Sequence, residues 1–149
     1  MAGTGGKLVA ALCGVLFSLG WWACIDGIAY GNKLAVENDQ ISMLFVFLPL
    51  GSTLAILLLN TISSKNIVHD DSPFGESSPM QRVLLFVYLG LLLLCPAITI
   101  WLVSQYYLQS SMGVEQKLPA MMQMFSTGLL TVCGLLFKFG RIHEDDSFF

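Results

Sequence analysis

Four long stretches of the chain are almost wholly apolar, and polar residues gather between them. They are Leu8–Tyr30, Ile41–Leu59, Val83–Val103 and Leu118–Phe137. Crossing the hydrocarbon core of a bilayer takes a helix of about 20 apolar residues. Because lipid offers no hydrogen-bond partner to the backbone, we expect each stretch to be α-helical. The pattern therefore predicts an all-α fold, an integral membrane four-helix transmembrane bundle that forms one domain over residues 1–149.

The composition agrees with a membrane protein and excludes several other classes. Charged residues make up 11% of the chain, against roughly a quarter in soluble domains. They are too few to cover a water-facing surface. The mean hydropathy of +0.72 is not that of a disordered chain, and the net charge of −3 argues against nucleic-acid binding. A soluble enzyme, a disordered chain and a nucleic-acid binder are therefore excluded.

The positive charges beside the spans predict their orientation. Lys7 precedes the first span, as in a cleaved signal peptide, but this span continues through Trp21 and Trp22 and is longer than a signal peptide's apolar region. We therefore expect it to be retained. Four spans place Lys7, Lys65, Arg82, Lys138 and Arg141 on one side of the membrane, and Lys33 and Lys117 on the other. Because positive residues favour the cytoplasm, both termini, the loop Asn60–Arg82 and the tail Lys138–Phe149 are predicted to be cytoplasmic.

Small residues recur at every fourth position along one side of the first span. The row consists of Ala10, Gly14 and Ser18, and it continues through Trp22 and Asp26. Residues four apart share one face of a helix, and small side chains let a second helix approach closely. The row, together with the neighbouring Trp21, is therefore predicted to be a helix-packing or partner-binding surface. Weaker versions occur at Gly51 and Ala55 in the second span and at Ser126 and Gly134 in the fourth.

Asp26 is the one ionisable side chain inside an apolar stretch. Such residues are candidates for function. By the rise of a helix, Asp26 lies roughly 27 Å from Leu8 and so near the lumenal boundary. Three interpretations stay open. Asp26 is an interfacial carboxylate that caps or orients helices, stabilised by water or Lys117; it forms a buried intramembrane ion pair or a polar contact to a partner subunit; or it is a proton or ion site. Trp21 and Trp22 beside it suit either an aromatic belt or a partner-binding surface.

No catalytic, cofactor or metal site is predicted from the remaining residues. Pro49 and Pro96 lie inside the second and third spans, where each removes a backbone donor and is expected to kink its helix or free a carbonyl. The four cysteines lie in or beside the spans without metal-ligand spacing, and we interpret them as small packing residues. They are Cys13, Cys24, Cys95 and Cys133.

The C-terminal region carries two separate signals. Lys138 and Arg141 follow the fourth span on one face, and are predicted to be a cytoplasmic anchor whose cationic groups reach the lipid headgroups. Phe148 and Phe149 end the sequence. They either pack at the membrane interface or form an export signal for vesicle-coat machinery.

Two stretches resemble a known family at opposite ends of the chain. Gly14-Val-Leu-Phe-Ser-Leu-Gly-Trp-Trp-Ala-Cys-Ile-Asp26 and Gly134-Leu-Leu-Phe-Lys-Phe-Gly-Arg141 are similar to the first-span and last-span signatures of the transmembrane protein 50 family. This family is also called small membrane protein, and its fungal relative is vacuolar protein sorting-associated protein 68. The resemblance implies a four-helix endomembrane protein without known catalysis. It also implies traffic from the late endosome to the vacuole, with a second small four-span protein similar to the leptin receptor overlapping transcript family.

Residues and resemblance together predict a non-enzymatic subunit of an endomembrane trafficking complex. Its partners would be the lipid bilayer, the second four-span protein and vesicle-coat machinery, and its location the endosome, Golgi or endoplasmic reticulum. The alternative is a small homo-oligomeric transporter or channel that uses Asp26 and the kinks at Pro49 and Pro96 as a polar path.

Overall fold

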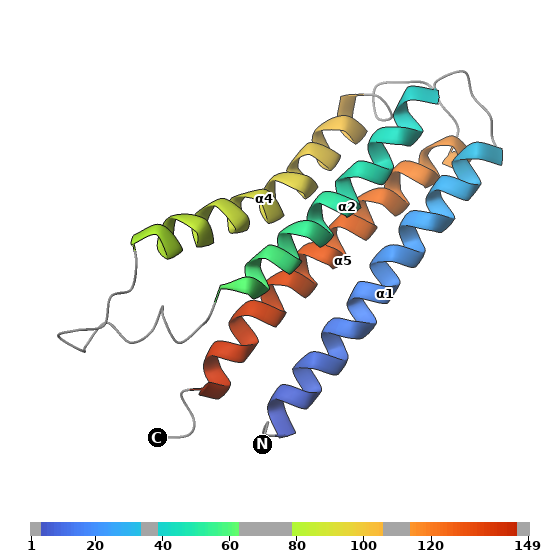
Figure 1. Cartoon of the computed structure of the whole chain (residues 1–149). Helices are drawn as coiled ribbons and strands as arrows, with labels where there is room; N and C mark the ends of the chain where they lie inside the picture. Colours follow the sequence, from blue (N-terminus) through green and yellow to red (C-terminus); the bar gives the residue numbers. More distant parts are fainter. Residues whose placement is uncertain (1–3, 34–38, 63–78, 106–113, 146–149) are drawn as a thin grey trace.

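The computed structural model describes residues 4–33, 39–62, 79–105 and 114–145, and these form helices. Each helix contains one of the four predicted apolar stretches, so the all-α class is confirmed. The helices are α1 (Thr4–Lys33), α2 (Asp39–Thr61), α4 (Pro79–Val103) and α5 (Val114–Asp145) (Figure 1).

Three of the helices are long and apolar enough to cross a membrane. Their candidate spans are Gly5–Gly31 in α1, Met80–Val103 in α4 and Lys117–Gly140 in α5. In α2 the apolar helical stretch is shorter and runs over Val46–Thr61. A membrane protein with several apolar helices is therefore supported, while the crossing by α2 and the cytoplasmic placement of the termini stay predictions.

Three helices extend into segments that the apolar pattern assigned to the loop and the tail, and one of them, α2, does so by two residues, Asn60 and Thr61. α4 begins at Pro79, because proline is tolerated in the first turn of a helix, where its missing N–H has no partner to lose. α5 continues through Lys138 to Asp145. Residues 63–78 of the predicted loop and 146–149 of the predicted tail lie outside the described residues.

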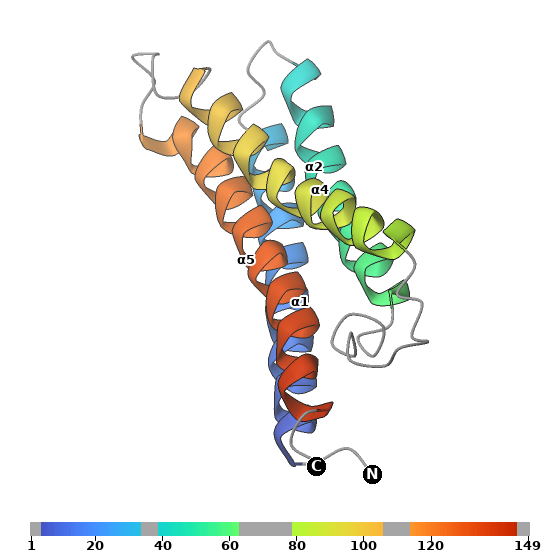
Figure 2. The ribbon, with the colours of Figure 1, turned by 90° about the vertical axis from the view of Figure 1, so that its left-hand side faces the viewer.

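The helix α5 lies at the centre of the arrangement and contacts all three others. α1 packs mainly along α5, while α4 packs on α2 and α5 (Figures 1 and 2). The helices alternate in direction. The start of α1, the end of α2, the start of α4 and the end of α5 therefore lie at one end of the bundle (Figure 1).

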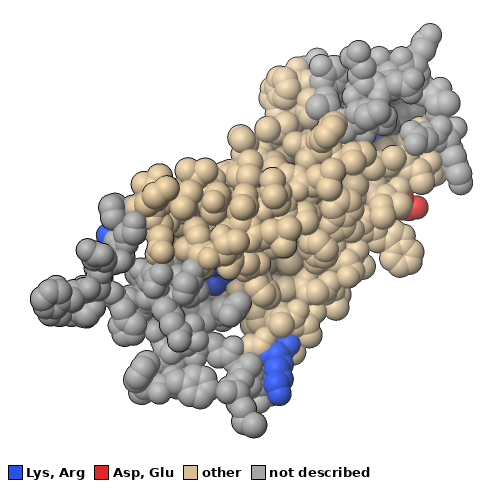
Figure 3. Space-filling model, in the orientation of Figure 1, with Lys and Arg blue, Asp and Glu red and all other residues tan. Residues whose placement is uncertain are grey.

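The polarity of α5 is opposite to that of a helix in a soluble bundle. Its buried side includes the polar residues Gln123, Ser126, Thr127, Thr131 and Lys138. Its exposed side carries large apolar residues, namely Met121, Phe125, Val132, Leu136 and Phe139. A water-soluble helix buries its apolar stripe, whereas lipid favours apolar side chains outside and polar side chains between helices. The broad uncharged belt in Figure 3 agrees with a lipid-facing surface.

A compact apolar cluster joins α2, α4 and α5. Its buried members are Ala55, Ile56, Leu59, Leu92 and Leu130, and half-buried aromatic residues such as Phe17 and Trp21 pack against it. Gly134 lets α5 approach this cluster closely. A Cβ atom on Gly134 would lie 2.9 Å from side-chain carbons of both Ile56 and Leu92. The weak small-residue pattern at Gly134 therefore marks an internal helix contact.

Thr131 compensates for the donor that Pro96 removes from α4. Pro96 has no N–H to offer the Leu92 carbonyl one turn earlier. The Thr131 hydroxyl of α5 donates to the Thr127 carbonyl of its own helix at 2.8 Å and lies 3.5 Å from the Leu92 carbonyl oxygen, so the Leu92 carbonyl receives the weaker share of its one hydrogen. Hydroxyl side chains of neighbouring helices commonly satisfy carbonyls freed by proline in membrane proteins.

Replacing Thr131 by Val is expected to cost about 1 kcal/mol of stability, because the Leu92 carbonyl then loses its donor inside the bundle. The cost should largely disappear in a Pro96→Ala background, where residue 96 supplies an N–H again. Unfolding by SDS titration in mixed micelles, run on all four members of this double-mutant cycle, measures the coupling. Equal costs of Thr131→Val in both backgrounds would show that the hydroxyl does not serve the freed carbonyl.

Candidate partner-binding face

The inner side of α1 is a row of small residues that packs on α5. Cys13, Gly20, Cys24 and Gly27 are all buried. A Cβ atom on Gly20 would lie 3.1 Å from the Leu130 side chain, and one on Gly27 would lie 3.1 Å from that of Met122. Small residues at these positions let the two helix backbones approach closely.

Two cysteines hold α1 and α5 together through reciprocal contacts. The Cys13 thiol lies 3.6 Å from the Cys133 carbonyl oxygen, and the Cys133 thiol lies 3.3 Å from the Cys13 carbonyl oxygen. Nearer the other end of α1, the Cys24 and Gln123 side chains are hydrogen-bonded. The described structure holds all four cysteines as buried free thiols, in agreement with their interpretation as packing residues.

The predicted row on α1 lies on the opposite, outer side of the helix. Ala10, Gly14, Ser18, Trp22 and Asp26 are all exposed, and we call them the outer row. A Cβ atom added to Gly14 would meet nothing within 4 Å. The Ser18 hydroxyl donates to the Gly14 carbonyl oxygen at 2.9 Å, so it needs no partner from elsewhere. The outer row takes no part in packing within the described chain, and its role as a partner-binding face stays a prediction.

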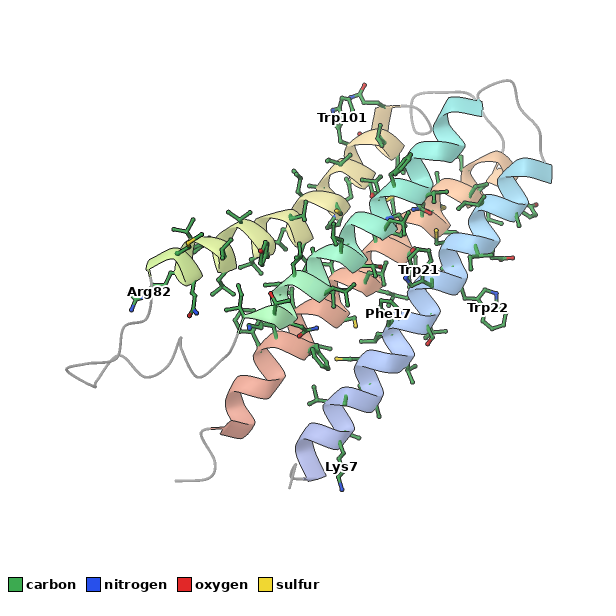
Figure 4. All side chains as sticks on the ribbon, viewed as in Figure 1. Lys7, Phe17, Trp21, Trp22, Arg82 and Trp101 are labelled. Carbon is green, nitrogen blue, oxygen red and sulfur yellow. The ribbon has the colours of Figure 1, made fainter. Side chains whose placement is uncertain are left out.

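The two tryptophans of α1 point in different directions (Figure 4). Trp21 is half-buried in the bundle, where its indole N–H donates to the Thr53 hydroxyl of α2 at 3.2 Å. That hydroxyl in turn donates to the Pro49 carbonyl at 2.9 Å. Trp22 is 71% exposed and points away from the other helices. Trp21 thus packs inside the chain, and Trp22 alone belongs to the outer row.

Asp26 has no partner within the described part of the chain. No described residue donates a hydrogen bond to its carboxylate or forms an ion pair with it, and Lys117 is therefore not its partner. The side chain is exposed on the same side of α1 as Trp22. All three interpretations of Asp26 therefore stay predictions.

Lys138 is buried instead of lying among the headgroups. Its side chain is 5% exposed, and its ammonium donates to the carbonyl oxygens of Leu59 at 3.1 Å and Ile62 at 2.7 Å. These carbonyls lie at the C-terminal end of α2, where a helix leaves its last four carbonyls unsatisfied and is partially negative. The Leu58 carbonyl is satisfied by the hydroxyl of Thr61 at 2.7 Å. The predicted anchoring role of Lys138 is corrected: the residue caps a neighbouring helix.

The spacing of polar residues along α5 contains the signal for this role. Gln123, Thr127 and Thr131 follow one another at every fourth position, and Lys138 lies seven residues further along the same face. That face is buried, while Leu136 and Phe139 on the other side are exposed. Hydropathy alone places a lysine after an apolar run in the headgroup region, because it ignores which face the lysine occupies.

The other predicted residues of the C-terminal region are described only in part. Arg141 belongs to α5, but its side chain lies outside the described residues, and so do Phe148 and Phe149. Within the described residues, no group of three or more His, Cys, Asp or Glu lies close enough together to hold a metal. The described residues thus form a close α1–α5 contact, a capped C-terminal end of α2 and an outer row that no described helix covers.

Comparison with known proteins shows to which protein family the chain is related. A model of the Uncharacterised protein family (UPF0220) matches residues 4–147. The chain is 23% identical to the "Transmembrane protein 50 homolog" of Dictyostelium discoideum over 147 residues. This alignment covers 95% of this chain and 94% of that relative. No solved structure matches the chain. The matches include both end motifs, and the chain therefore belongs to this family of transmembrane proteins, the transmembrane protein 50 family.

Proposed function

We propose that the protein is a non-enzymatic subunit of an endomembrane complex that sorts proteins between the late endosome and the vacuole or lysosome. It acts by helix–helix association in the bilayer. The observation that carries the proposal is the uncovered outer row of α1. A Cβ atom added to Gly14 would have no neighbour within 4 Å, and Ser18 is exposed. A face of small residues offers another helix close backbone contact, which large lipid-facing side chains prevent.

The exposed face of α4 provides the contrast. Its exposed side chains are mostly large and apolar, including Phe86 at 73%, Leu93 at 48% and Trp101 at 58% exposure. Such side chains suit acyl chains. The exposed side of α1 also carries large apolar residues, among them Leu12, Val15 and Leu19, but its outer row adds small residues, a hydroxyl and a carboxylate to them. The carboxylate, which has no counterpart among the exposed side chains named on α4, supports a protein partner at α1, and the second four-span protein similar to the leptin receptor overlapping transcript family is the partner we propose.

The placement of Asp26 favours association over a transport path. Asp26, the ionisable residue of the alternative path, is exposed on the outer side of α1 and does not face the buried polar residues of α5. Pro49 is buried in α2, and the carbonyl freed by Pro96 has the Thr131 hydroxyl as a partner. A sorting subunit is therefore the function we propose in preference to a conduit. Its proposed location is the endosome, Golgi or endoplasmic reticulum, with its C-terminal tail available to coat machinery.

Large residues on the outer row should release the partner. In the Gly14→Leu, Ser18→Leu double variant, the amount of partner recovered with the protein in a mild-detergent purification is expected to fall about tenfold or more, because the close helix approach is lost. Delivery of a lysosomal hydrolase should fall with it, and the hydrolase should appear outside the cell. Partner recovery is measured by quantitative mass spectrometry.

Gly90 of α4 supplies the matched control. It is also exposed, and a Cβ atom there meets nothing within 4 Å, so Gly90→Leu should leave both partner recovery and hydrolase delivery unchanged. Membrane insertion is checked for every variant by alkaline extraction. If the complex survives both leucines on α1, the outer row is not the interface.

A further inference from the structure

The position of Asp26 along α1 places its carboxylate at the edge of the hydrocarbon. Lys7, near the start of α1, and Asp26 are both exposed, and 19 residues of helix separate them along the axis by about 28 Å. The hydrocarbon core is about 30 Å thick. When Lys7 lies at one boundary, Asp26 therefore lies at the other, one turn beyond the exposed Trp22.

A carboxylate at that depth is costly unless a donor or a cation accompanies it. The described residues of the chain provide neither. Its exposed neighbours Trp22 and Ile25 are 71% and 60% exposed and largely apolar. Among the described residues, the face around Asp26 is thus apolar with one negative charge that none of them compensates, and such a charge selects a partner by its charge as well as by its shape.

The same charge disfavours a second copy of the chain at this face. Two copies with the same orientation in the membrane are related by a two-fold axis normal to the bilayer. Such an axis through the outer rows brings two Asp26 side chains to the same depth, and two like charges at the edge of the hydrocarbon repel each other strongly. A helix with a cation at that depth gains a charge-assisted hydrogen bond instead.

We propose that the outer row of α1 binds a transmembrane helix of a different protein, and that this helix carries a lysine or arginine at the lumenal boundary, where it pairs with Asp26. The inference rests on the proposed function and adds the chemistry of the partner to it. Gly14 and Ser18 set how closely the helix approaches, while Asp26 sets which helix is accepted and at what depth.

Photo-crosslinking from Trp22 tests the proposal in cell membranes with the full chain. A photoreactive phenylalanine derivative at Trp22 should give one adduct with a different protein, and the same residue at Trp101 of α4, which is also exposed, should not. Asp26→Asn should lower the adduct about tenfold, the loss expected for one charge-assisted hydrogen bond. Asp26→Glu should retain it.

Charge exchange then identifies the pairing. Asp26→Lys should abolish the adduct, and exchanging the boundary cation of the cross-linked protein for glutamate should restore it. The proposal is overturned when two differently tagged copies of this chain cross-link to each other, when the adduct is the same in Asp26→Asn, when only lipid adducts form, or when the captured helix has no boundary cation.

If the leucines at Gly14 and Ser18 release the partner while Asp26→Asn does not, the proposed function stands and the charge pairing fails. Where no complex forms at all, both fail.

Discussion

Replacing Lys138 by Met is expected to lower the free energy of unfolding by about 2 to 4 kcal/mol, because two buried carbonyls of α2 lose their donor. Methionine has a similar length and fills the same space, so lost packing contributes little. The ammonium of Lys138 lies 3.1 Å from the Leu59 oxygen and 2.7 Å from the Ile62 oxygen. The measurement is SDS titration of the purified protein in mixed micelles, followed by tryptophan fluorescence.

The control for this variant is the same substitution at Lys7. Lys7 is exposed at the same end of the bundle, so Lys7→Met should change the unfolding free energy by less than about 0.5 kcal/mol. Lys138→Arg keeps the positive charge and the donors, and should recover part of the loss. A Lys138→Met protein that unfolds at the wild-type SDS concentration would contradict the capping role.

Replacing Gly134 by Val should destabilise the bundle by about 2 to 3 kcal/mol through overpacking. A Cβ atom at this position would lie 2.9 Å from Ile56 and Leu92 carbons, so α5 must move away from α2 and α4. The unfolding midpoint in the same SDS titration should shift accordingly, and disulfide cross-linking between cysteines introduced on α2 and α5 should slow.

Gly128 provides the comparison within the same helix. A Cβ atom on Gly128 meets nothing within 4 Å, so Gly128→Val carries the same change in helix propensity without the clash. The difference between the two variants isolates the close contact. Equal stabilities of the Gly134 and Gly128 variants would mean that α5 does not approach the other helices as closely as described.

The helical class and the approximate helix positions follow from the apolar stretches, and the family follows from motifs at the two ends. The ends of the helices were predicted less well, since hydropathy marks where the hydrocarbon ends and a helix can continue beyond it. α5 shows this, because it extends through Lys138 to Asp145.

The small-residue patterns identified helix contacts within the chain, but they did not distinguish these contacts from a face that no described helix covers. The longest pattern, the outer row, lies on the exposed side of α1, where no described helix covers it. The weaker patterns at Gly51, Ala55, Ser126 and Gly134 mark contacts inside the bundle. A glycine on a helix permits close approach by any neighbour. Its presence alone does not say whether the neighbour belongs to the same chain.

The sequence by itself determined that the chain is an apolar, all-helical membrane protein with an isolated carboxylate and small residues along its first helix. These are local properties, since the length of an apolar run and the spacing of residues on one helix need no knowledge of the others. Only the tertiary structure decided that Lys138 caps α2, that Thr131 serves the carbonyl freed by Pro96, and that Trp21 faces inward while Trp22 faces outward. Each depends on how one helix is rotated against another, and that rotation is set by close packing across the whole bundle.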